Sequence, residues 1–196
     1  IFISFLIMEL INQDEFNGRK IELSKKLLNT VFIYPTDTIY GLGCNATNKD
    51  LINQVRELKG RYQRPFSVIA PSKKWILDNC EVDKNAQEWI NKLPGPYTLI
   101  LKVKHKNSVA DNINPGLNTV GVRMPNNWFA KVVEDLDVPI ITTSVNIVGE
   151  PFMTSLDDLD SNIKKGVNFI FYTGEISGTP SKLVFLDKPE VKVQER

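Results

Sequence analysis

One stretch, residues 31–69, constrains the fold of this chain more than any other. It reads VFIYPTDTIYGLGCNATNKDLINQVRELKGRYQRPFSVI. The β-branched and aromatic run at 31–34 predicts a short buried strand, and Pro35 ends it because proline cannot donate to a ladder. Apolar side chains then recur at helical spacing over residues 48–59, after Asn48 as N-cap. A strand, a loop and a helix in this order are typical of an α/β sheet.

The loop after the first strand carries candidate binding groups. Thr36, Asp37 and Thr38 place three oxygen-bearing side chains at the strand's end, which is where open α/β sheets bind ligands. Gly41 and Gly43 predict a glycine turn, or a close approach of the backbone to a ligand or another strand.

A cluster of basic residues follows the helix. It contains Lys59, Arg61 and Arg64, with Gly60 as the expected C-cap. The helix macrodipole favours cations at this end, so a purely structural role stays open. An anion-binding site is the functional alternative.

The rest of the chain continues the mixture of helices and strands, and no repeat or linker divides it. Helical spacing predicts helices over residues 17–29, 72–79, 84–93, 127–136 and 156–165, with Ile21, Leu23, Leu27 and Leu28 as core residues of the first. Short apolar runs predict strands over residues 66–70, 97–103, 119–124, 139–143, 167–172, 182–186 and 191–193. We therefore expect one α/β domain with a mixed sheet.

Length, charge and cysteine content restrict the function classes. A chain of 196 residues buries about 70% of its unfolded surface, enough for a real core. The net charge of +1 is too small to attract nucleic acid or a membrane surface at long range, so any basic patch is local. Cys44 and Cys80 stand apart without metal-ligand spacing. This fits a reducing, cytoplasmic location.

The first seven residues, IFISFLI, are apolar but too short to span a membrane. They also lack the basic region and cleavage site of a signal peptide. We expect the native chain to begin at Met8, with residues 1–7 a misassigned extension, and residues 8–196 to form the single domain. An N-terminal strand is the alternative.

Several common catalytic motifs are absent. The chain has neither a P-loop nor a G-x-S-x-G nucleophile elbow. Residues 41–46, GLGCNA, formally fit the dinucleotide fingerprint. They lie too far past the strand, however, and lack the acidic partner about 20 residues on. His105 lies among lysines, which favours a solvated surface histidine over a catalytic one.

What remains is a site of cations and hydroxyls. Lys and Arg bind phosphate through charge-assisted hydrogen bonds worth about 1.5–3 kcal/mol each. Phosphoryl and nucleotidyl transfer depend mostly on positioning and charge neutralisation. A carboxylate nucleophile is already ionised at neutral pH and needs no general base, so transfer at a phosphate suits these residues.

Five motifs occur in a fixed order along nearly the whole chain. They are PTDTIYGLG at 35–43, KGR at 59–61, PGPYT at 94–98, TVGVRMP at 119–125 and SVN at 144–146. In these motifs the chain resembles the threonylcarbamoyl-AMP synthase family, also called YrdC-like or TsaC, in its short single-domain form. The resemblance implies a twisted, mixed parallel and antiparallel open sheet, with helices packed on it and a concave basic groove.

The resemblance also implies a reaction and its partners. L-threonine, bicarbonate and ATP, with Mg²⁺ accompanying the ATP, give L-threonylcarbamoyl-AMP and pyrophosphate. A separate transferase then moves the threonylcarbamoyl group to tRNA beside the anticodon, forming t6A. Direct binding of tRNA is left open, and no membrane is involved.

The resemblance assigns roles by position. Thr38, Arg123 and Ser144 contact threonine, with Arg123 suited to the carboxylate. Lys59 and Arg61 are the catalytic pair that holds the triphosphate. The nucleotide contacts are Lys59, Arg61, Arg64, Thr119, Asn146, Thr154 and Arg196. Thr119 and Arg123 are expected to flank the same strand end, and Ser181 ranks lower as a further hydroxyl.

The chain departs from the family pattern in places. The segment after KGR is one residue shorter than usual, so Arg64 stands where the family has Asn or Lys. Residues 144–152 lack two of the family's serines, and Ile69 or Ala70 stands where some members carry a histidine. Structural explanations also exist: Thr36, Thr119 and Thr143 suit strands, and Ser144 and Asn146 suit turns.

Two other function classes stay open. An RNA-binding module would use Lys59, Arg61, Arg64 and Arg123 along the groove, with strongly salt-dependent binding. The low net charge and the missing aromatic stacking motif count against it. A carbamoyl-transfer role, as in hydrogenase-maturation proteins that contain the same domain, would need further domains and zinc-finger cysteines that this sequence lacks.

Overall fold

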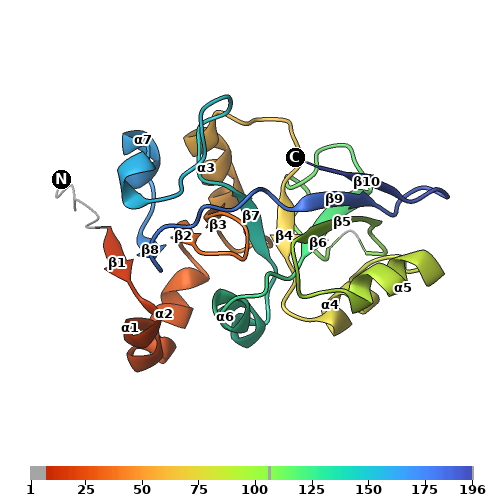
Figure 1. Ribbon diagram of the computed structural model, residues 1–196, viewed down its shortest axis with the longest axis horizontal. Helices are drawn as coiled ribbons and strands as arrows, with labels where there is room; N and C mark the ends of the chain where they lie inside the picture. The colour runs from red at the N-terminus through yellow and green to blue at the C-terminus, as the bar shows by residue number, and fades with distance from the viewer. Residues whose placement is uncertain (1–7, 106, 196) are drawn as a thin grey trace.

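The computed structural model describes residues 8–105 and 107–195, in which ten strands form one sheet in the order β1-β8-β2-β3-β7-β4-β6-β5-β9-β10 (Figure 1). The strands are β1 Glu9–Ile11, β2 Phe32–Tyr34, β3 Gly41–Gly43, β4 Ser67–Ile69, β5 Tyr97–Lys102, β6 Thr119–Arg123, β7 Ile140–Ser144, β8 Phe169–Phe171, β9 Lys182–Phe185 and β10 Lys192–Gln194. The helices are α1 Gln13–Gly18, α2 Lys20–Leu27, α3 Lys49–Lys59, α4 Lys73–Asn79, α5 Lys84–Asn91, α6 Phe129–Leu136 and α7 Ser161–Lys165.

The sheet is mixed, as predicted. Four neighbouring pairs are parallel, β1–β8, β8–β2, β4–β6 and β5–β9. The central strand β7 is antiparallel to both of its neighbours, β3 and β4. In the strand order, β8 and β9 lie on opposite sides of the central strand β7. The connection from β8 to β9 therefore crosses the sheet.

Three expectations from the sequence differ in the structure. Residues 41–43 form the strand β3 and not a turn, whereas the alternative, a close approach to another strand, is confirmed: a Cβ at Gly43 would lie 2.2 Å from the carbonyl oxygen of Ile141 on β7. The predicted helix 17–29 is two helices that meet at Arg19. Ile21 is 77% exposed rather than core, since it lies about 200° around the helix from Leu23.

Two further differences concern short elements. Residues 156–165 form a 3₁₀ turn, Leu156–Asp158, followed by α7, instead of one helix. Strand β1 was not predicted, and it pairs in parallel with β8. The expectation for residues 1–7 lies outside the described residues.

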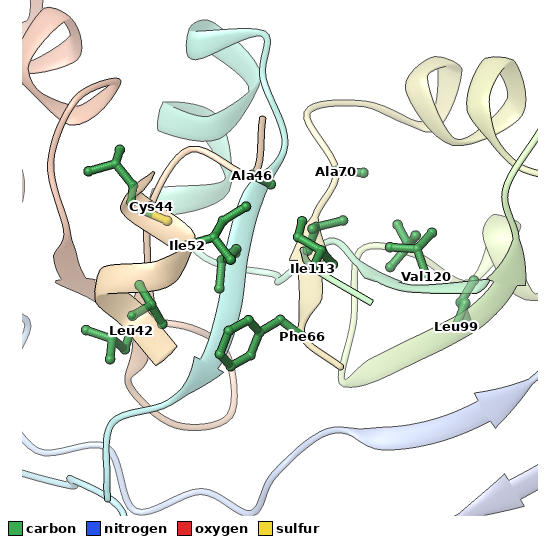
Figure 2. Packing of buried hydrophobic residues seen from close by; sticks show 14 of the residues in the cluster. Leu42, Cys44, Ala46, Ile52, Phe66, Ala70, Leu99, Ile113 and Val120 are labelled. Atoms are coloured by element: carbon green, nitrogen blue, oxygen red, sulfur yellow. The ribbon is translucent and has the colours of Figure 1, made fainter. Parts of the chain in front are cut away.

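The core is divided into two clusters on opposite faces of the sheet. In β2, Ile33 belongs to one cluster, whereas Phe32 and Tyr34 belong to the other. The larger cluster contains apolar residues of α3, α4, α5 and α7. Figure 2 shows part of it, labelling Leu42, Cys44, Ala46, Ile52, Phe66, Ala70, Leu99, Ile113 and Val120.

The second cluster covers only part of its face. It packs α1, α2 and α6 against β1, β8 and β2 and against single residues of β4 and β7. On the remaining face of the central strands, Ser67 of β4 lies between Gly121 of β6 and Thr142 of β7. Small and hydroxyl side chains leave space here for a ligand. Large apolar side chains would have filled that space. Among the described residues, no helix is both long and apolar enough to cross a bilayer.

Candidate functional site

A cavity of about 220 Å³ lies over this polar part of the sheet. Its floor includes Ser67, Thr98, Arg123, Thr142 and Ser144 from four strands, and its walls come from loops and from single residues of β3 and β7. The wall residues are Thr36, Ile39, Tyr40, Gly41, Arg61, Pro65, Phe66, Thr143, Phe152, Pro180 and Ser181. Two arginines therefore face a cavity rich in hydroxyl groups, while the wider basic groove remains a prediction.

Arg123 is the buried cation of the cavity, with its side chain only 5% exposed. Its Nη2 lies 2.5 Å from Oδ1 of Asp37, and both terminal nitrogens lie 3.3 Å from Oγ1 of Thr38. Burial lowers the pKa of Arg123, and the charge of Asp37 opposes this shift. Nε of Arg123 is buried without a hydrogen-bond partner, so one donor on this guanidinium is available to an oxygen anion.

The loop after β2 presents Asp37 and Thr38 to Arg123. Thr36 holds this loop in shape: its Oγ1 accepts from the backbone nitrogens of Thr38 and Ile39 and donates to the carbonyl of Ile39 at 2.7 Å. This is an ST-turn that the PTDT sequence can form locally. Thr36 therefore shapes the loop, and it also lines the cavity. Thr38 contacts Arg123 but is not among the residues that line the cavity, so its contact with threonine stays a prediction.

Arg61 lies on the opposite wall, half-buried. Its Nη1 lies 3.3 Å from Oγ1 of Thr143, Nη2 donates to the carbonyl of Pro65, and its guanidinium lies 5.0 Å from the ring centroid of Phe66. Arg61 lines the cavity together with Ser144. Its position fits an anionic ligand that enters from the loop side.

Lys59 does not line the cavity. It is 2% exposed, and its Nζ lies 2.5 Å from the carbonyl of Ser144, 2.7 Å from the carbonyl of Asn146 and 3.1 Å from Oδ1 of Asn146. Three acceptors match the three protons of an ammonium group. In this arrangement Lys59 fastens the SVN turn to α3, and its contact with a triphosphate remains a prediction.

Titration of Lys59 should be visible in the stability of the protein. Burial, with the charge of Arg61, lowers the pKa of Lys59 to about 7, against about 10.4 in an unfolded chain. Between these values only the unfolded state keeps the proton. We therefore expect the stability of the wild type relative to Lys59→Met to rise by up to about 1.4 kcal/mol per pH unit from pH 7 to 10.

Urea unfolding of the wild type and Lys59→Met across this pH range measures the difference between their free energies of unfolding. Titration of the other groups affects both proteins equally and cancels in this difference. Below pH 7 the difference should be constant, because both states of the wild type are protonated. A difference that stays constant up to pH 10 would show that the three oxygen acceptors hold the pKa of Lys59 near its ordinary value.

A segment from the C-terminal part of the chain closes the cavity. Figure 1 shows the connection from β8 to β9 running across one face of the central strands. Tyr40 anchors it, donating from its hydroxyl to the carbonyl of Gly174 at 2.6 Å and accepting from the backbone nitrogen of Thr173 at 3.1 Å. The hydroxyls of Thr98 and Ser181 lie 2.7 Å apart at its end. Ser181 is thus a buried wall residue of the cavity.

The structure separates two residues that were expected together. Thr119 is the first residue of β6 and Arg123 the last, about 13 Å apart at ~3.3 Å per residue. The prediction that they flank one strand end is wrong, because the TVGVR motif spans the whole strand. Both point to the same face as Gly121, so Thr119 as a nucleotide contact stays a prediction.

The other predicted nucleotide residues lie near a second cavity or at the surface. Asn146 and Thr154 line a cavity of about 660 Å³, which shares Phe152 with the first. The side chain of Arg64 is exposed, and so is His105, as expected. Arg196 lies outside the described residues.

Sequence reasoning missed several residues at the site. Ser67, Thr98 and Thr142 are the hydroxyls of its floor, and Tyr40 anchors the segment above it. Their signal is a polar residue inside an otherwise apolar strand, as in IITTS and YTLILK. A hydroxyl that faces the interior side of a sheet needs a partner or a ligand.

Comparison with known proteins identifies the family. A family profile for Sua5, YciO and YrdC, described as telomere recombination, matches residues 28–195. The chain belongs to the Sua5/YciO/YrdC family. The family resemblance and the α/β fold with a mixed sheet are thereby confirmed.

Individual members of the Sua5/YciO/YrdC family cover this chain to different extents. A Methanocaldococcus jannaschii protein, provisionally named a threonylcarbamoyl-AMP synthase, is 30% identical over 92% of this chain and 86% of its own length. Escherichia coli YciO, which is uncharacterised, is 27% identical over 93% of this chain and 90% of its own. The structure of Pyrococcus abyssi Sua5 complexed with L-threonine matches with a TM-score of 0.84 and 26% identity, over 95% of this chain but 56% of that one.

Proposed function

We propose that this chain is an L-threonylcarbamoyl-AMP synthase, which joins L-threonine, bicarbonate and ATP and releases pyrophosphate. The observation that carries the proposal is a pair of arginines in one cavity: Arg123 on the floor with an unused donor, and Arg61 on the wall. Two cationic points suit two different anions, a carboxylate and a phosphate. The names of the Bacillus subtilis and Vibrio campbellii relatives, threonylcarbamoyl-AMP synthases, support this reading.

The amino acid would occupy the Arg123 end. The carboxylate of threonine would pair with Arg123. The hydroxyl and amine of threonine would then lie within reach of Thr38, Ser144 and the floor hydroxyls. This places the substrate deep in the cavity, beneath the segment that Tyr40 anchors. The Pyrococcus abyssi protein complexed with L-threonine supports an amino-acid site in this fold.

The nucleotide would extend from Arg61 past Ser144 into the second cavity, where Asn146 and Thr154 lie. Arg61 and Lys59 offset phosphate charge, while Arg64 and Thr119 supply outer contacts. Mg²⁺ would accompany ATP, since it is usually held by phosphates and one or two carboxylates. In the part of the chain that the structure describes, no group of three or more acidic, His or Cys residues is positioned to hold a metal ion, so the phosphates would provide most of its ligands.

The transfer at phosphorus then needs no protein base. The free amine of threonine and bicarbonate form N-carboxythreonine and water, and an oxygen of the new carboxylate attacks the α-phosphorus of ATP. The bond from the α-phosphorus to the bridging oxygen breaks, and pyrophosphate leaves with that oxygen. The residues of the site contribute by aligning the two anions and by offsetting the charge between them.

We also propose a destination for the product of the reaction. The product would serve a separate transferase that modifies tRNA as t6A, in the cytoplasm. Direct contact with tRNA is a further part of this proposal, and salt-dependent binding of tRNA would measure it.

The first test is pyrophosphate release from ATP and bicarbonate, with and without L-threonine. We expect release that depends on threonine, together with an AMP adduct of the mass of threonylcarbamoyl-AMP. Serine lacks one methyl group, which is worth about 1–3 kcal/mol of discrimination, so it should react more slowly. If the folded protein binds RNA but releases no pyrophosphate, the synthase proposal is wrong and the RNA-binding module takes its place.

A further inference from the structure

Arg56 lies on α3, one turn before Lys59, and outside the cavity. It is 5% exposed, although it is a charged side chain on a helix surface. Among the described residues no carboxylate forms an ion pair with it. A buried arginine of this kind needs other acceptors for all five of its protons.

Backbone carbonyls provide those acceptors. Nε and Nη2 of Arg56 donate to the carbonyl of Asn112 at 3.1 and 2.6 Å, and Nη2 also donates to Ile113 at 2.9 Å. Nη1 donates to the carbonyl of Arg61 at 2.9 Å and of Arg64 at 3.1 Å. These five bonds use the whole planar fork of the guanidinium and join two loops that are about 50 residues apart in the chain.

Phe66 completes the arrangement. The guanidinium of Arg56 lies 4.6 Å from its ring centroid and that of Arg61 lies 5.0 Å from the same centroid. The backbone nitrogen of Phe66 donates to the carbonyl of Ile113, which Arg56 also contacts. The backbone of Arg61 and the ring beside its side chain thus both depend on one buried residue.

We propose that Arg56 is a positioning residue for Arg61. Arg56 holds the 61–66 loop in the shape in which Arg61 binds the phosphates of ATP. This inference rests on the proposed function for the identity of the ligand. Lysine could not replace it, since an ammonium has three protons and no planar fork.

The test is the variant Arg56→Lys, examined by calorimetric binding of ATP and, separately, of L-threonine. We expect the Kd for ATP to rise about tenfold, the effect of losing roughly one charge-assisted hydrogen bond. The Kd for L-threonine, bound at the Arg123 end, should change less than about twofold. A residue with only a structural role would change both affinities or neither.

A double-mutant cycle shows whether the effect passes through Arg61. In the Arg61→Ala background, Arg56→Lys should cost less than about twofold in ATP affinity, because the group that it positions is gone. Ile52→Val, a buried change on the same helix, is the control: it should lower the melting temperature without changing ATP affinity. If Arg56→Lys does not fold, Phe66→Leu tests the same arrangement and should also weaken ATP binding selectively.

Three results would overturn the proposal: unchanged ATP affinity in Arg56→Lys and Phe66→Leu, costs of Arg56→Lys and Arg61→Ala that simply add, or a wild type that binds no ATP. Binding is measured without turnover. A protein that binds ATP in this Arg56-dependent way but releases no pyrophosphate would contradict the proposed function and leave the inference about Arg56 intact.

Discussion

Replacing Arg123 should abolish threonine-dependent pyrophosphate release. The side chain is the buried cation of the cavity. Its Nε has no hydrogen-bond partner and its Nη1 makes one bond with two protons, so the proposed substrate carboxylate has two protons to bind. Two charge-assisted hydrogen bonds at about 1.5–3 kcal/mol each correspond to a loss of about 10²- to 10⁴-fold in kcat/KM for threonine. Pyrophosphate release by Arg123→Met, assayed over a range of threonine concentrations, measures this loss.

The stability of this variant needs its own control. Asp37 is 12% exposed in its side chain and pairs with Arg123, so Arg123→Met alone leaves a buried carboxylate without its partner. Breaking such a pair costs about 3–5 kcal/mol. The double variant Arg123→Met with Asp37→Asn removes both charges and should recover most of the stability but none of the activity. If the double variant recovers activity as well, the site of the threonine carboxylate is elsewhere.

Replacing Arg61 should have the second largest effect, and it should act on ATP. Arg61 lines the cavity beside Ser144, where the proposed phosphates lie. Arg61→Ala should lower kcat/KM for ATP by about 10²-fold or more. Threonine binding, measured by calorimetry without ATP, should change little, because Arg61 and Arg123 lie on different sides of the cavity.

Arg19→Ala is the matched control for Arg61→Ala. Arg19 pairs with Glu9 and Glu22 on the surface, away from both cavities, and its loss should cost little stability and no activity. Arg61→Lys should recover only part of the activity, since lysine offers a point charge without the planar fork. Wild-type kinetics in Arg61→Ala would remove Arg61 from the site.

Sequence reasoning predicted the central elements well where the pattern was local. Pro35 ends β2, Asn48 caps α3 by accepting from the backbone nitrogens of Asp50 and Leu51, and Gly60 is its left-handed C-cap. These features depend on residues that are neighbours in the chain, so their geometry is encoded within a few positions. The ordered motifs identified the family for the same reason.

The errors lie where partners are distant in the chain. Gly41 and Gly43 resemble a turn in isolation, but β3 forms because β2 and β7 lie on either side of it. The first helix divides at Arg19, and strand β1 exists only because β8 is beside it. Propensity gives no information about such pairings.

The same distinction applies to the site. The sequence by itself determined which residue types are available, most of the central strands and helices, and the loops in which Thr38 and Arg61 lie. Only the tertiary structure decided that Lys59 turns inward to carbonyls 85 and 87 residues away, that Thr119 and Arg123 lie at opposite ends of one strand, and that Arg56 joins the loops around Arg61. The physical reason is that a buried cation must satisfy its protons with whatever acceptors the fold brings close, and those acceptors are set by long-range packing rather than by neighbouring residues.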